Sequence, residues 1–294
     1  MTSAGDRAKR PVVEVRGLRV RYGPRDVVDG VDLTVAEGEV VALLGPNGAG
    51  KTTTIEVLEG FRKRSAGEVR VLGVDPERGD EAWRARLGVV LQSWRDHGRW
   101  RVRELLSYLA ALYAPYRPDV FGADELLALV GLTDHARSRV GVLSGGQRRR
   151  LDVAIGLVGR PDLLFLDEPT VGFDPEARRE FHEVLGRLSA TAVLLTTHDL
   201  AEAEKLADRI AVLVAGRVVA DGTAAELAAR IAGDTEVRYR LHGREHVLSV
   251  ADSTDYVREL FAEHGRAVDD LEVRRASLED VYLALVRESE PVSA

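Results

Sequence analysis

Cysteine is absent from this 294-residue sequence, so disulfide bonds and cysteine-ligated zinc are excluded. No apolar run reaches about 18 residues, the length that a transmembrane helix requires, so we expect no such helix. Residues 1–11 are polar and basic with no apolar stretch behind them, which argues against a secretory signal. Together these absences favour a cytosolic protein.

Positive charge is outnumbered by negative charge, and lysine in particular is scarce. The chain has 41 Lys and Arg against 48 Asp and Glu, which gives a formal net charge of −7. Because a nucleic-acid-binding protein usually presents a basic field, we expect no nucleic-acid partner. A hydrophobic fraction of 45% and a charged fraction of 30% are ordinary for a globular protein. Lysine occurs only at Lys9, Lys51, Lys63 and Lys205.

Lys51 belongs to a glycine-rich segment, residues 45–52, that fits the pattern G-x-x-x-x-G-K-[S/T]. A continuous apolar run at 40–44 precedes it and is typical of a strand buried on both faces of a parallel sheet. A helical pattern at 51–58 follows. Strand, glycine-rich loop and helix form the context of a phosphate-binding P-loop. We expect Lys51 to reach the β- and γ-phosphates of a nucleotide and Thr52 to ligate Mg²⁺.

A second apolar strand, residues 163–166, ends in Asp167 and Glu168. In P-loop enzymes an acid in this place holds Mg²⁺, which we predict for Asp167. We predict that Glu168 acts as the general base that activates water. The alternative is that both acids are solvated and cap the next helix.

Three further segments carry polar residues in places that suit phosphate chemistry. Residues 143–147 read LSGGQ and precede a helical pattern, and a helix N-terminus beside glycines attracts anions. His198 follows a predicted strand at 192–196, and Gln92 ends another at 88–91. The arginine run 148–150 favours a solvated or structural role, with a contribution to the field on the phosphate as the alternative.

In this order along the chain, the segments resemble those of the ATP-binding subunits of ABC transporters. The resemblance implies ATP and Mg²⁺ as cofactors, with ATP bound between two ATPase subunits and hydrolysed. It implies catalytic roles for Glu168, His198 and Gln92, and metal ligation by Thr52, Gln92 and Asp167. It assigns nucleotide contacts to Tyr22, which would stack on adenine, and to Gly45, Pro46, Asn47, Gly48, Ala49, Gly50, Lys51, Thr52, Thr53, Ser144, Gly145, Gly146, Gln147 and Asp174.

The same resemblance implies the partners and the location. Ser144 and Gly146 would contact the nucleotide of the opposite subunit, which we expect to be a second copy of this chain. A separate transmembrane permease would complete the transporter, so the chain would lie peripherally on the cytoplasmic face of the cell membrane. Phe173 stands where the family usually has Leu. Residues 94–101, WRDHGRWR, also depart from the family pattern, and they favour either loop packing or contact with the permease.

The predicted fold is α/β, a P-loop NTPase of the ABC type with a mostly parallel core sheet and a small antiparallel β subdomain. We place the ATPase domain at 12–224, with a helical insertion at about 93–160. Residues 225–294 form a small α+β accessory module, with strands at 236–241 and 246–250, a helix at 255–263 and a last helix from Ser277.

Residues 276–283, ASLEDVYL, resemble the tail of exporter ATPases of the daunorubicin-resistance type. This favours an exporter of drugs, lipids or polysaccharides. The alternative is a soluble, non-transport ABC ATPase in translation or DNA maintenance. Translation-type members usually carry two ATPase units and chromosome-type members long coiled-coil insertions, and this chain has neither. A catalytically inactive regulator is disfavoured because Glu168 and His198 are both present.

Overall fold

The structure, a computed structural model, describes residues 10–90, 97–171, 173, 175–188, 190–231, 235–274, 279 and 282. The chain divides into two compact units, residues 1–219 and 220–294. The sequence patterns placed this boundary between residues 224 and 225.

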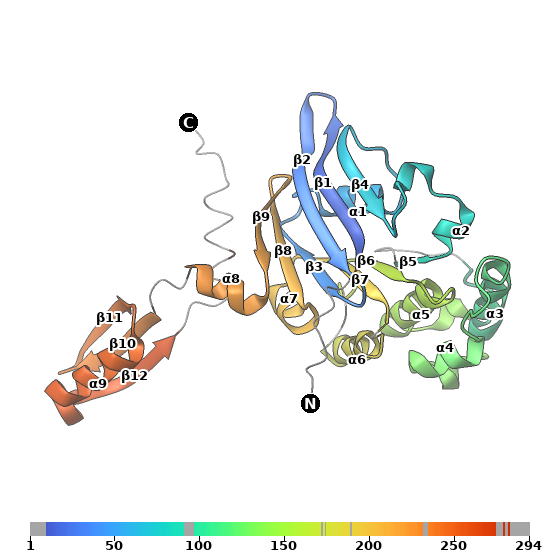
Figure 1. Cartoon of the computed structure of the whole chain (residues 1–294). Helices are drawn as coiled ribbons and strands as arrows, with labels where there is room; N and C mark the ends of the chain where they lie inside the picture. Colours follow the sequence, from blue (N-terminus) through green and yellow to red (C-terminus); the bar gives the residue numbers. More distant parts are fainter. Residues whose placement is uncertain are drawn as a thin grey trace, which may run out of the picture. The chain divides into compact units, whose positions relative to one another are not determined.

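A six-stranded sheet in the order β5-β6-β7-β3-β8-β9 forms the centre of the first unit (Figure 1). From β5 to β8 every neighbouring pair is parallel. β9 follows β8 through the turn Ala215–Gly216, in which both residues have positive φ, as a tight hairpin turn requires. The predicted mostly parallel sheet is therefore confirmed. Its strands are β3 (Val40–Leu44), β5 (Leu87–Val90), β6 (Leu163–Asp167), β7 (Ala192–Thr197), β8 (Arg209–Val214) and β9 (Arg217–Gly222).

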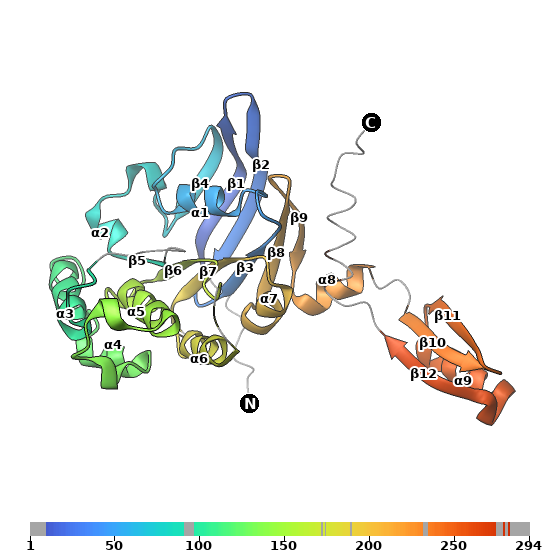
Figure 2. The same ribbon diagram turned by 180° about the vertical axis from the view of Figure 1, so that it is seen from behind.

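An antiparallel sheet, in the order β2-β1-β4, packs against one face of this sheet. Helix α1 (Lys51–Leu58) contacts β2, β4 and β6, and Figure 2 shows it beside β4. Phe165 of β6 is fully buried in the core that these elements share, and burial of one such side chain contributes about 1.5–3 kcal/mol. This sheet is the predicted small β subdomain, made of β1 (Pro11–Tyr22), β2 (Arg25–Ala36) and β4 (Ala66–Val71).

Alternate residues of the central strands face the other side of the sheet, where helices α5, α6 and α7 lie (Figure 1). A Cβ on Gly156 of α5 would touch Val90 and Leu164, so this helix lies close against β5 and β6. Both faces of these strands are therefore shielded from solvent, which explains their continuous apolar runs. The helices are α5 (Gly145–Leu157), α6 (Pro175–Gly186) and α7 (Leu200–Leu206).

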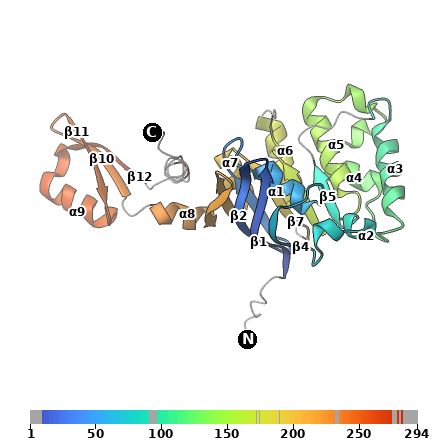
Figure 3. The same ribbon diagram turned by 90° about the horizontal axis from the view of Figure 1, so that it is seen from above.

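The described residues between β5 and β6 form helices and 3₁₀ turns with no strand among them, as the predicted helical insertion requires. In the view from above, α3, α4 and α5 group beside β5 (Figure 3). α3 buries Val102, Leu105 and Leu106 in this group. Short 3₁₀ turns at Thr133–His135 and Val140–Val142 connect α4 to α5. The helices of this insertion before α5 are α3 (Val102–Tyr113) and α4 (Ala123–Leu129). Helix α2 (Glu81–Arg84), which follows a 3₁₀ turn at Pro76–Arg78, comes before β5 and lies outside the insertion.

The second unit contains an antiparallel sheet in the order β11-β10-β12. One face packs on α9 around Val237, Tyr239 and Leu260. The sequence patterns did not predict β12, and the last helix predicted from Ser277 lies outside the described residues. The elements are α8 (Ala224–Ile231), β10 (Thr235–Leu241), β11 (Arg244–Val250), α9 (Ser253–His264), a 3₁₀ turn (Gly265–Ala267) and β12 (Val268–Arg274). Within the described ranges of both units, no helix combines the length and apolarity needed to cross a bilayer.

Candidate nucleotide-binding site

The glycine-rich loop connects β3 to α1, and two of its glycines have no room for a side chain. A Cβ on Gly45 would lie 2.2 Å from the carbonyl oxygen of Leu213, and one on Gly50 would lie 2.7 Å from that of Val27. Gly50 also has a φ of 105°, a conformation that L-residues with a side chain avoid. These constraints keep the loop tightly wound at the N-terminus of α1, the end of a helix that attracts anions.

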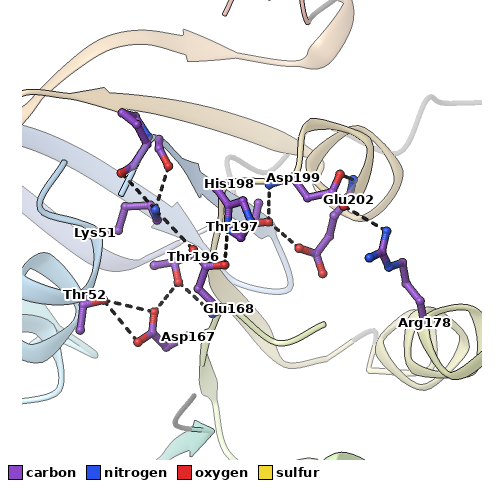
Figure 4. A network of polar contacts seen from close by, with 12 residues as sticks. Lys51, Thr52, Asp167, Glu168, Arg178, Thr196, Thr197, His198, Asp199 and Glu202 are labelled. Carbon is purple, nitrogen blue, oxygen red and sulfur yellow. Dashed lines mark hydrogen bonds and ion pairs between the residues drawn. The ribbon is translucent and has the colours of Figure 1, made fainter. Parts of the chain in front are cut away.

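Lys51 is buried at the base of this loop, with 6% of its surface exposed. Its ammonium donates hydrogen bonds to the carbonyl oxygens of Gly45, at 2.7 Å, and Pro46, at 3.3 Å. It also lies 3.4 Å from Oε1 of Glu168 (Figure 4). Because an unpaired buried charge is costly, these partners hold the ammonium inside the site.

Asp167 stands at the carboxyl end of β6, opposite the first turn of α1. The hydroxyl of Thr52 lies 3.5 and 3.4 Å from its two carboxylate oxygens. The buried Thr196, from the neighbouring strand β7, donates a 2.5 Å hydrogen bond to Oδ1 (Figure 4). Strand pairing between β6 and β7 therefore fixes one side of the carboxylate and leaves it facing Thr52.

Glu168 follows directly and has a φ of 47°, an uncommon conformation for a residue with a side chain. Its N–H donates to two oxygens of Thr196, the hydroxyl at 3.0 Å and the carbonyl at 3.2 Å. The carboxylate reaches His198, whose Nδ1 lies 2.6 Å from Oε2. Such a backbone conformation costs about 1–3 kcal/mol and persists where surrounding contacts hold it, here the hydrogen bonds to Thr196. It turns Glu168 away from Asp167 and toward Lys51 and His198.

Lys51, Thr52, Glu168 and His198 line one cavity of about 410 Å³, a volume in the range of small-molecule sites. Asp167 faces Thr52 but is not itself among the lining residues. The cavity brings together residues from the P-loop, from the end of β6 and from the end of β7. The helix N-terminus and Lys51 supply positive potential, and Glu168 and His198 supply proton-transfer groups. Its lining residues are Val27, Asn47, Gly48, Gly50, Lys51, Thr52, Thr53, Glu168, Val171 and His198.

Comparison with known proteins shows the family. A family model described as ABC transporter matches residues 28–171. The chain is 40% identical over 305 residues to the daunorubicin resistance ATP-binding protein DrrA3 of Streptomyces coeruleorubidus, covering 93% of this chain and 95% of that protein. This chain belongs to the ABC transporter ATP-binding family. The resemblance found in the sequence is thereby confirmed, and the chain is an ATPase.

Two further comparisons agree with this assignment. The fluoroquinolones export ATP-binding protein MT2762 of Mycobacterium tuberculosis is 37% identical over 291 residues, covering 95% of both chains. A solved ATP-binding subunit of an ABC transporter is 26% identical, with a TM-score of 0.68, and the match covers 93% of this chain and 99% of that one. The predicted fold class of this ABC ATPase is therefore confirmed as well.

Not all predicted site residues of this ABC ATPase meet at the cavity. Ala49 packs in the core, and Gly45 and Pro46 contribute carbonyl groups to Lys51. Tyr22 lies at the tip of the β1–β2 hairpin, 42% exposed and outside the cavity lining, with the Arg62 guanidinium 5.0 Å from its ring centre. Two further predicted residues, Gln92 and Asp174, lie outside the described residues.

The segment 144–147 starts helix α5 away from the cavity of the same chain. Ser144 caps the helix, because its hydroxyl accepts from the N–H of Gln147 at 3.3 Å. The Gln147 side chain accepts in return from the N–H of Ser144 at 3.0 Å, which completes a capping box. Ser144 and Gly145 are exposed, so this helix N-terminus is accessible from outside the chain.

Arg149 is a site residue that sequence patterns did not separate from its neighbours in the arginine run. It is buried, unlike Arg148 and Arg150, and burial lowers its pKa. Its guanidinium donates to the carbonyl oxygen of Pro169 at 2.9 Å and to that of Asp167 at 3.1 Å. Arg149 therefore ties helix α5 to the backbone on both sides of Glu168, a structural role.

Glu59 is the C-cap residue directly after α1 and is a second group that the sequence did not single out. It is buried with 6% of its surface exposed, and burial raises its pKa from 4.5 to about 8, helped by the negative charges of Asp167 and Glu56. The unfolded chain would release this proton near the ordinary pKa, whereas the folded protein keeps it up to about pH 8. Between these two values the folded state binds more protons, so its stability falls as pH rises.

We therefore expect Glu59→Gln to stabilise the protein at alkaline pH. The neutral amide removes the cost of a buried carboxylate, so the free energy of unfolding should rise by about 2–4 kcal/mol near pH 8.5 and change little near pH 4.5. Urea unfolding at the two pH values measures both differences. Equal effects at both pH values would contradict the raised pKa.

Proposed function

We propose that this ABC ATPase powers an exporter by hydrolysing ATP to ADP and phosphate. The observation that carries the proposal is the convergence of Lys51, Glu168 and His198 on one positively polarised cavity of about 410 Å³, with Asp167 facing Thr52 of its lining. The names of the relatives support export, since two of them are a daunorubicin resistance and a fluoroquinolones export ATP-binding protein. Drugs, lipids or polysaccharides are the cargo classes that this relationship favours.

Each residue has a role in this proposal. The loop N–H groups and Lys51 bind the β- and γ-phosphates and neutralise their charge. Glu168 accepts a proton from the attacking water, while His198, held against Glu168, orients that water at the γ-phosphate. The bond from water oxygen to γ-phosphorus forms as the bond to the leaving oxygen of ADP breaks. Gln92 completes the set of predicted groups around the water.

Mg²⁺ fits this donor set. The hydroxyl of Thr52 faces both carboxylate oxygens of Asp167, and Mg²⁺ is usually held by one or two such oxygen ligands together with substrate phosphates. Thr52 and Asp167, together with Gln92, would therefore hold the metal. When bound, it would neutralise charge on the phosphates.

The site of one chain lacks the groups that the family places at the γ-phosphate from the other side. The exposed N-terminus of α5, with Ser144, Gly145, Gly146 and Gln147, lies outside the cavity lining of its own chain. We propose that it closes the site of a second copy, with Asp174 and Tyr22 completing the nucleotide contacts. Two chains would then enclose two ATP molecules, and closure would drive a separate transmembrane permease from the cytoplasmic side.

Co-purification from native membranes tests this proposal. The tagged chain, solubilised gently, should bring down a polytopic membrane protein in comparable amount, since the proposed ATPase acts through a permease. Recovery of only ribosomes, nucleic acid or non-membrane proteins in repeated trials would favour a non-transport ABC ATPase. Absence of ATP turnover in the recovered complex would indicate a nucleotide-binding regulator instead.

A further inference from the structure

Strand β7 ends in two consecutive threonines whose side chains point to opposite faces, as they must in a strand. Thr196 faces Asp167 and Glu168, as described above. Thr197 is equally buried and faces helix α7 on the other side (Figure 4). His198 comes next, so its position depends on how firmly Thr197 is held.

Thr197 is held by three contacts. Its hydroxyl donates a 2.5 Å hydrogen bond to Oε2 of Glu202 and accepts one of 2.9 Å from the N–H of Asp199. Its carbonyl oxygen accepts from the N–H of Gly45 in the P-loop at 3.3 Å. The hydroxyl therefore bridges the turn that carries His198, from the residue before it to the residue after it.

Glu202 contacts this turn at both of its ends, through Thr197 and through Asp199. It is only 3% exposed, and its N–H donates to Oδ1 of Asp199 at 3.2 Å. The other oxygen of Asp199 pairs with Arg178 of α6 at 3.0 Å (Figure 4). Burial raises the pKa of the Glu202 carboxyl, opposed by hydrogen bonds from Thr197 and Thr170. The hydroxyls of Thr197 and Thr170 thus hold a largely buried acid beneath the end of β7.

We propose that Thr197 and Glu202 are positioning residues, which hold His198 against Glu168 in the geometry required for ATP hydrolysis. The proposal rests on the proposed function, because it takes His198 to act at the γ-phosphate. Neither residue lines the cavity, so neither is expected to bind the nucleotide. A displacement of His198 of about 1 Å is enough to lower turnover severalfold to a hundredfold.

Thr197→Val tests the proposal with little change of shape. We expect kcat for ATP hydrolysis by the full chain to fall about tenfold, with KM changed less than about twofold. Glu202→Ala should act similarly, whereas Glu202→Gln retains an acceptor for Thr197 and should keep more of the turnover. Glu204→Ala, on an exposed acid of the same helix, serves as the control. Thermal unfolding shows that each variant is folded.

A double substitution separates positioning from a general structural effect. If Thr197 acts through His198, Thr197→Val should change kcat less than about twofold when His198 is already Ala. The imidazole ¹⁵N signals of His198, assigned by their loss in His198→Ala, should shift in Thr197→Val and stay unchanged in Glu204→Ala.

Four results would overturn the proposal, in distinguishable ways. A tenfold loss that persists in the His198→Ala background, or a loss confined to KM, would show that Thr197 acts elsewhere. Parental turnover and unshifted His198 signals in Thr197→Val and Glu202→Ala would leave His198 functional but the two residues without a role. Parental turnover in His198→Ala alone would remove His198 from the proposed mechanism, and the positioning role with it.

Discussion

Glu168→Gln is expected to lower ATP turnover by about 10²–10⁴-fold while ATP binding is retained. The amide keeps the size of the carboxylate and a hydrogen-bonding group toward His198, which lies 2.6 Å away. It cannot accept the proton of the attacking water. It also removes a negative charge 3.4 Å from Lys51, so repulsion of the phosphates decreases and affinity for ATP should stay equal or rise.

Phosphate release under saturating ATP measures the loss, and equilibrium binding of a fluorescent ATP analogue measures affinity. Glu204→Gln provides a matched control, because it makes the same chemical change on an exposed face. Turnover near the parental rate in Glu168→Gln would exclude Glu168 as the base. A joint loss of turnover and binding would indicate that Glu168 mainly maintains the shape of the site.

Lys51→Met is expected to weaken ATP binding by about 10–100-fold and to abolish measurable turnover. Methionine fills similar space, but it removes a charged donor, and a hydrogen bond to a charged group contributes about 1.5–3 kcal/mol. Lys51→Arg should likewise weaken ATP binding and abolish measurable turnover. The ammonium is enclosed by the carbonyl oxygens of Gly45 and Pro46 and by Glu168, which leaves little room for a planar guanidinium.

Lys63→Met, at an exposed lysine shortly after α1, controls for the loss of one positive charge. Affinity measured by titration should be parental in this control. If Lys51→Met bound ATP as tightly as the parent, the loop backbone alone would provide the phosphate contacts, and the role assigned to Lys51 would be wrong.

The P-loop and the acids after β6 were predictable because their chemistry is local. The glycines that allow the loop, and the lysine and threonine that follow, stand in one contiguous segment, so spacing alone indicates the geometry. The parallel sheet was predictable for a similar reason, since strands covered on both faces need continuous apolar runs such as residues 163–166.

Contacts between distant segments were not predictable in this way. β12 was missed because Asp269 and Asp270 interrupt its apolar alternation, and Asp270 has a positive φ where the register with β10 shifts. Arg149 resembles Arg148 and Arg150 in sequence, and only the packing of α5 beside β6 selects it for burial.

The sequence by itself determined the family and located the glycine-rich loop, the two acids and the histidine for which we predict nucleotide chemistry. The tertiary structure alone decided how these groups are held. The strand order β6-β7-β3 brings Thr196 to Asp167 and Glu168, and Thr197 to the P-loop backbone. Strand order depends on pairing between residues far apart along the chain, which no local pattern encodes. For this reason the residues that support the site became visible only in the folded protein.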